Sequence, residues 1–176
     1  MSESNQIDIP RHVEGRSCGS CSLCCKVYDV PEIQKTAGKW CQFFKSGKGC
    51  TIHDKSPNQC REFFCNWMTH ASLGPEWKPD RCRFVMTTNP YNLNLTIQVD
   101  PGFRSAWKEK QYYDVLKQWA LKLMERDNYI FVFDGITTFI VLPDRDEDIG
   151  VIGQNQKVYF NKRIINGFLR IEVEKR

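Results

Sequence analysis

The stretch Cys18-Gly-Ser-Cys-Ser-Leu-Cys-Cys25 decides how the first half of this chain is built. Three of its thiols follow one another at intervals of three residues, and the fourth is adjacent to the third. The small residues between them tolerate the tight backbone turns that aim neighbouring sulfurs at one point. The stretch therefore predicts a local group of metal-ligating thiols.

Further cysteines extend this pattern. The 176-residue chain holds nine, and eight of them lie between Cys18 and Cys65. Thiolates are soft ligands, which excludes magnesium and calcium and leaves zinc, iron and Cu(I). Eight thiols suffice for two four-coordinate sites, or for one site with cysteines to spare. The predicted metal ligands are Cys18, Cys21, Cys24, Cys25, Cys41, Cys50, Cys60 and Cys65.

Disulfides are the competing explanation for so many cysteines. The polar start of the chain lacks the apolar stretch of a secretory signal, and the number of cysteines is odd. Adjacent Cys24 and Cys25 are also poorly placed to pair with each other. Metal binding is therefore favoured over disulfides, and the cytoplasm is the expected compartment.

The spacing leaves the identity of the metal open. The first three cysteines match the C-x2-C-x2-C opening of bacterial ferredoxins, but Cys25 stands where that pattern has no ligand. An iron–sulfur cluster would take its fourth thiolate from one of the four later cysteines. Zinc needs only four soft ligands in a tetrahedron. The expected cofactor is zinc or iron, with an iron–sulfur cluster as one form of the latter.

The residues around these cysteines resemble those of a known family, the CxxCxxCC (YkgJ-type) family of bacterial cysteine-cluster proteins. The resemblance runs from Cys18 to Trp67 and includes Trp40-Cys41, Gly49-Cys50, Pro57 and Cys65-Asn66-Trp67. It implies a zinc- or iron-chelating domain whose eight cysteines are those named above. Two positions differ, because Ser56-Pro57 replaces a common Arg-Pro pair and His53 stands where Tyr is frequent.

The remainder of the first part has little with which to build an apolar core. Aliphatic residues are thinly spread between Cys18 and Asp80, and no period of 2 or 3.6 residues is sustained. The sequence predicts loops and short helical turns that are ordered by bound metal, because metal binding at such sites is coupled to folding. Residues 1–82 are expected to form this cysteine-cluster region, with its aromatic residues packed around the ligands.

After Cys82 the pattern changes to regular structure. Leu93 to Val99 alternates apolar and polar residues, which predicts a half-buried strand ended by Asp100-Pro101-Gly102 and paired with 83–88. Apolar residues at helical spacing predict an amphipathic helix within 105–126.

Two hairpins are expected after that helix. The first is 129–142, with a two-residue turn at Asp134-Gly135, and the second has its turn at Asn166-Gly167. Residues 143–148 are expected to form an acidic surface loop. The prediction is an α+β fold in which 83–176 forms an antiparallel sheet covered by one helix, packed as one unit with 1–82.

Three other residues with reactive or charged side chains are not expected to be metal ligands. Cys82 is expected to be a partly buried free thiol, and His53 a surface residue rather than a ligand. Arg61 is expected either to donate to thiolate sulfurs or to form a salt bridge with Glu62 or Asp54.

Composition and motifs restrict the classes of function. The net charge of +4 is not gathered in a basic run, so nucleic acid is not an expected partner. No apolar run is long enough to cross a bilayer, so no membrane association is expected. Familiar catalytic motifs are missing, which leaves open whether the chain is an enzyme.

Three hypotheses follow. The first is a metal-chelating protein, and the second is an iron–sulfur oxidoreductase or electron carrier. The third is a zinc-ordered module that binds a protein or RNA through exposed aromatic residues such as Tyr91 and Tyr129.

Overall fold

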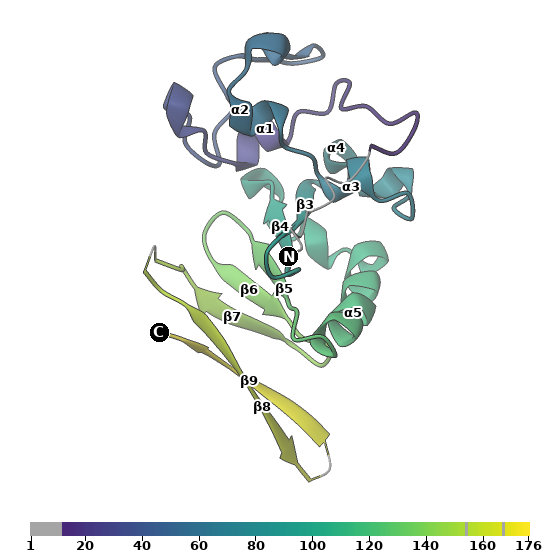
Figure 1. The fold of residues 1–176 in the computed structure, drawn as a ribbon, viewed down its shortest axis with the longest axis vertical. Helices are drawn as coiled ribbons and strands as arrows, with labels where there is room; N and C mark the ends of the chain where they lie inside the picture. The colour runs from purple at the N-terminus through teal and green to yellow at the C-terminus, as the bar shows by residue number, and fades with distance from the viewer. Residues whose placement is uncertain (1–11, 154, 167) are drawn as a thin grey trace, which may run out of the picture.

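The computed structural model describes residues 12–153, 155–166 and 168–176. It has three parts, which follow one another along its long axis (Figure 1). Short helices and loops with the cysteines lie at one end, a five-stranded sheet with its helix lies in the middle, and a long hairpin lies at the other end. The predicted α+β class is confirmed.

The cysteine-containing part consists of short elements joined by turns, as its lack of periodicity predicts. A two-stranded ribbon, in which Phe44 pairs with Cys50, is the only strand pair of this part of the described chain. Its elements are α1 (Cys24–Val27), η1 (Pro31–Ile33), β1 (Phe44–Lys45), β2 (Gly49–Cys50), η2 (His53–Lys55), α2 (Asn58–Arg61), α3 (Asn66–Thr69), η3 (Pro75–Trp77) and α4 (Pro79–Cys82).

The central sheet has the strand order β3-β4-β5-β6-β7. Its strands and helices are β3 (Phe84–Thr88), β4 (Leu95–Val99), η4 (Pro101–Phe103), η5 (Ala106–Lys108), α5 (Lys110–Met124), β5 (Ile130–Phe133), β6 (Thr138–Val141) and β7 (Asp146–Gly150). The predicted helix and first hairpin are present, and so is the predicted strand, although it begins at Leu95 rather than Leu93, which has φ +58° and is exposed. The Asp100 carboxylate caps η4 by accepting a hydrogen bond from the Gly102 amide at 2.8 Å, which ends β4 as expected.

Three details of the predicted sheet are wrong. Strands β4 and β5 are parallel, so the sheet is mixed rather than antiparallel. Helix α5 forms the crossover between these two strands, because a parallel pair needs a long connection. The first hairpin turns over residues 134–137 instead of two residues, since Phe133 pairs with Thr138. Residues 146–150 form edge strand β7, where the sequence predicts a loop.

The second hairpin is longer than its apolar residues predict. It consists of β8 (Val158–Ile165) and β9 (Phe168–Lys175), which pair with each other as a separate two-stranded sheet. The side chains at its base pack with Tyr129, Ile140 and Leu142 of the central part. Tyr129 is therefore buried, with its ring stacked 3.5 Å from that of Phe160, and the prediction that it is exposed is wrong.

Strand β3 joins the central sheet to the cysteine-containing part. Phe84 and Met86 belong to the main core with Trp107 and Leu116, on the side that α5 covers. Val85 points the other way and packs with residues that surround the first cysteines, namely Leu23, Val27, Cys65 and Met68. This small second core places the cysteine loops against a rigid strand.

A cysteine-lined cavity as the candidate functional site

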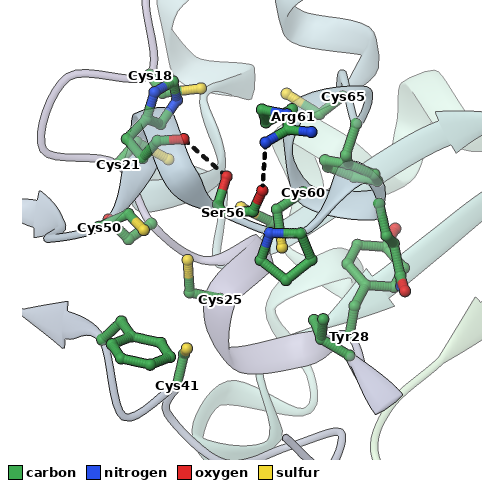
Figure 2. A pocket seen from close by; sticks show the side chains of 18 of the residues that line it. Cys18, Cys21, Cys25, Tyr28, Cys41, Cys50, Ser56, Cys60, Arg61 and Cys65 are labelled. Carbon is green, nitrogen blue, oxygen red and sulfur yellow. Dashed lines mark hydrogen bonds between the residues drawn. The ribbon is translucent and has the colours of Figure 1, made fainter. Parts of the chain in front are cut away.

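All eight predicted metal ligands line one cavity of about 440 Å³. They come from separate turns and short helices that surround it, with Cys18 and Cys65 at one side and Cys41 at the other (Figure 2). Apolar side chains fill the wall between them, including Phe63, Phe64 and Val85. The ninth cysteine, Cys82, does not line this cavity; it is buried and hydrogen-bonded to the backbone oxygens of Trp77 and Phe84.

Backbone hydrogen bonds hold the cysteine turns in place. The Cys21 amide donates to the Cys18 carbonyl at 2.8 Å, and the Cys41 amide donates to the Cys25 carbonyl at 3.0 Å. Gly49 has φ +78°, and a Cβ there would lie 3.2 Å from the Gly19 carbonyl oxygen. Only glycine therefore lets the β1–β2 ribbon approach the first cysteine turn without strain, and this approach brings Cys50 to the cavity.

The thiols surround the cavity without forming a finished ligand set. All nine cysteines lie in the described residues and none is in a disulfide. Across the described ranges 12–153, 155–166 and 168–176, no three side chains of His, Cys, Asp or Glu have the arrangement of a metal site. The structure thus gathers the predicted ligands in one place but does not bring them to one point.

Backbone amides already support two of the sulfurs. The amides of Leu23 and Asp80 donate to the Cys21 sulfur, and those of Met68 and Trp67 donate to the Cys65 sulfur. Burial is nevertheless the larger effect and raises the pKa of Cys21 to about 11. Amide hydrogen bonds of this kind stabilise the thiolate form and orient metal-bound sulfurs.

The adjacent pair Cys24-Cys25 has opposite pKa shifts. A hydrogen bond from the Cys24 thiol to the Cys25 sulfur lowers the pKa of Cys25 to about 7, while burial opposes this shift. The same hydrogen bond, together with burial, raises the pKa of Cys24 well above its ordinary value. The pair therefore shares one proton near neutral pH, and Cys25 is the member of the pair that ionises first.

Electrostatic coupling shows which thiols are neighbours. Burial raises the pKa of Cys60, and the charges of Cys25, Cys41 and Cys50 raise it further. On the other side, Cys65 is coupled to Cys18 and Cys21. The charge of Cys25 also raises the pKa of Cys18, and Cys24 is coupled to Cys18 and Cys21, so the thiols form one continuous group.

A buried lysine, which the sequence reasoning overlooked, lies in the cavity wall. Lys35 is 7% exposed, and its ammonium donates to the carbonyls of Lys26, at 2.9 Å, and of Tyr28. Burial lowers the pKa of Lys35, whereas the neighbouring charges of Cys25 and Cys41 raise it. Buried lysines are rare unless they are paired, and no pattern in the sequence marks Lys35 as one of them.

The other predicted neighbours of the site are placed as follows. Arg61 lines the cavity, but its guanidinium donates to the Ser56 carbonyl, at 2.8 Å, and to the Asn58 side chain. His53 is exposed and lines the cavity. His12 also lines the cavity, and its ring lies edge-on to that of Phe64, with 4.1 Å between the ring centres.

The predicted packing of aromatic residues around the ligands is present only in part, because Trp40 stacks on Phe44 and is 47% exposed.

The comparisons with known proteins name no relative. The chain matched no protein-family model, no curated protein and no solved structure.

Proposed function

We propose that this chain binds zinc or iron through the eight cysteines that line the cavity. The observation that carries the proposal is that eight cysteines with free thiols, from turns up to 47 residues apart, all line one cavity. The resemblance to the CxxCxxCC family, drawn from the residues around these cysteines, supports the same conclusion. In this proposal the cavity is the metal centre, and Cys82 has no part in it.

The chemistry of the wall fits such a metal. A set of donors composed of thiols selects soft or borderline ions. The amide hydrogen bonds to Cys21 and Cys65 are those that support bound thiolates. Lys35 would offset part of the negative charge that several thiolates carry together. When bound, the ion would draw the surrounding thiols together, and its binding energy would stabilise their turns.

An iron–sulfur cluster is the second candidate, and it implies a redox role. A cavity of 440 Å³ lies in the range of about 300–1,000 Å³ found for sites that hold organic ligands and cofactors, and is spacious for a single ion. Cys60 and the three thiols whose charges raise its pKa, Cys25, Cys41 and Cys50, would offer the four ligands that a cluster needs. A bound cluster would supply one-electron transfer, and these residues would hold it.

Metal analysis of the purified protein tests the proposal. The chain is expressed without added metal, purified under nitrogen, and analysed for zinc, iron and acid-labile sulfide together with its visible spectrum. Colourless protein with zinc alone supports the chelating site, whereas iron with matching sulfide and broad visible absorption supports the cluster. Protein that is folded and free of metal, and that takes up neither zinc nor iron, contradicts both.

A matched pair of variants shows whether the cavity holds the metal. Cys25→Ser or Cys60→Ser is expected to reduce the metal content by half or more. Cys82→Ala removes a thiol outside the cavity and is expected to leave the metal content unchanged. Equal metal loss in all three variants would show that binding depends on the number of thiols or on overall stability, and not on this cavity.

A further inference from the structure

The β8–β9 hairpin changes character along its length. At its base, Phe160, Ile171 and Val173 pack with residues of the central sheet. Further out it leaves the body of the molecule, and its apolar side chains enter solvent: Ile164 is 78% exposed, Ile165 47% and Leu169 48%. Ile164 and Leu169 are cross-strand partners.

Two of these exposed residues, Ile164 and Leu169, continue the buried face of the hairpin, whereas Ile165 lies on its other face with Arg163 and Arg170. Side chains two residues apart on a strand lie on the same face, so Leu169 follows Ile171, which is 4% exposed. The apolar face is thus covered at the base and uncovered at the end. We call Ile164, Ile165 and Leu169, with the flanking Arg163 and Arg170, the hairpin tip.

The hairpin also carries the net charge of the chain. Residues 157–176 contain six Lys and Arg against two Glu, a net charge of +4 that equals the total for all 176 residues. Residues 1–156 therefore balance to zero. Arg163 and Arg170 are directly opposite each other in the register, and their side chains are 65% and 56% exposed.

Each arginine of the tip already has a weak partner. Arg163 lies 3.4 Å from Glu172, and Arg170 lies 3.3 Å from Asp144. Lys162, further down, pairs with Asp127. Exposed ion pairs contribute little to stability, so both guanidinium groups can exchange these partners for another anion at small cost.

We propose that the hairpin tip docks on the surface of an anionic phospholipid bilayer. The apolar side chains would enter the headgroup region, while the two arginines would meet lipid phosphates and carboxylates. This is contact at the interface only, since no helix in the described residues is long and apolar enough to cross a membrane. The proposal is independent of the cysteine-containing part, which lies at the opposite end of the molecule from the hairpin (Figure 1).

Charge and shape argue against two other occupants. A second copy docked tip to tip would bring together two hairpins that each carry a net charge of +4, and these charges repel each other. The phosphates of a nucleic acid would pair with the arginines, but they would leave Ile164 and Leu169 without an apolar partner. A bilayer surface matches the charge and the apolar side chains together.

Co-sedimentation of the full chain with vesicles tests the proposal. We expect it to bind phosphatidylcholine vesicles that contain phosphatidylserine and to bind pure phosphatidylcholine vesicles at least tenfold more weakly. The double variant I164S/L169S is expected to lose roughly tenfold or more in affinity, from the loss of two apolar side chains. Each of Arg163→Gln and Arg170→Gln is expected to lose about fivefold.

A matched control tests whether vesicle binding depends on the hairpin tip or on any exposed apolar side chain. Ile136 is 62% exposed in the loop after β5, whereas Lys162, next to the tip, contacts Met124 and Asp127, which precede β5 in the chain. Ile136→Ser is expected to bind vesicles like the unaltered chain, and far-ultraviolet circular dichroism checks that all variants are folded. Equal binding to both kinds of vesicle, or unchanged binding by folded I164S/L169S, would overturn the proposal. So would tighter binding to a DNA duplex, or a dimer in sedimentation equilibrium that I164S/L169S abolishes.

Discussion

Single side chains set the chemistry of the cavity, and Cys25 is the clearest case. Its sulfur accepts a hydrogen bond from Cys24, and the pKa of Cys25 falls to about 7, while burial raises that of Cys21 to about 11. The sequence shows the two adjacent thiols but not which of them donates, because that depends on how the first turn of α1 is oriented. The proton distribution is therefore a property of the fold.

Selective alkylation checks this distribution. In protein treated with a chelator, iodoacetamide is expected to modify Cys25 first, because the thiolate is the reacting form. Its rate should rise with pH and level off above about 7, the pKa of Cys25. Peptide mass spectrometry gives the rate at each cysteine.

The variant Cys24→Ala provides the control for that measurement. It removes the hydrogen bond that lowers the pKa, so the midpoint of Cys25 modification should move upward by a unit or so. A midpoint that stays near 7 in this variant would show that another group, such as Lys35, is responsible.

Elements of the fold differ in how far the sequence predicts them. Strand β4 and helix α5 follow directly from periodicity, because each buries one face. The parallel pairing of β4 with β5 does not, since it depends on where α5 returns the chain. The sequence of strand β7 does not alternate apolar and polar residues, so periodicity does not predict it. Its residues form a strand by pairing with the edge of β6. The gathering of the cysteines could be expected from their spacing, whereas Lys35 in the wall could not.

The turn between β5 and β6 depends on one carboxylate. Asp134 is 4% exposed and accepts hydrogen bonds from the amides of Ile136 and Thr137, each at 2.9 Å, and from Arg104 at 2.7 Å. Asp134→Ala is expected to lower the free energy of unfolding by about 1.5–3 kcal/mol, as for hydrogen bonds to a charged group. Urea unfolding measures this loss. Asp114→Ala, at an exposed helical ion pair, should change the free energy of unfolding by less than about 0.5 kcal/mol.

The contribution of Asp134 should also depend on pH. Burial raises the pKa of Asp134, but the hydrogen bonds from Thr137, Ile136 and Arg104 outweigh it, and the net pKa is lowered. A lowered pKa in the folded state means that the stabilisation is complete above the ordinary pKa of about 4 and is lost as pH falls below it. The difference between the unaltered chain and Asp134→Ala should therefore shrink between pH 5 and pH 3. A constant difference would show that the carboxylate is not the source.

At the scale of the whole molecule, two kinds of core hold the chain together. The central sheet has a large apolar core with Trp107, Leu116 and Ile130, while the cysteine-containing part has the small core around Val85. If metal binding completes the folding of the cysteine-containing part, this part should be less stable than the central sheet when the metal is removed.

Hydrogen exchange after chelation measures that difference. Removal of the metal is expected to reduce protection at amides between Cys18 and Cys65, while β4, β5 and α5 keep theirs. Protein loaded with metal again should recover the lost protection. Loss of protection across both parts at once would show a single cooperative unit, in which the sheet depends on the metal as well.

The position of the β8–β9 hairpin has a consequence for biosynthesis. Tyr129, Ile140 and Leu142 leave the ribosome before Phe160 and Ile171, which later cover them. At about 5–20 residues per second, an apolar face of the nascent chain stays open for one to several seconds. A chain whose translation stops before the hairpin would keep that face uncovered and would be a substrate for chaperones and a nucleus for aggregation.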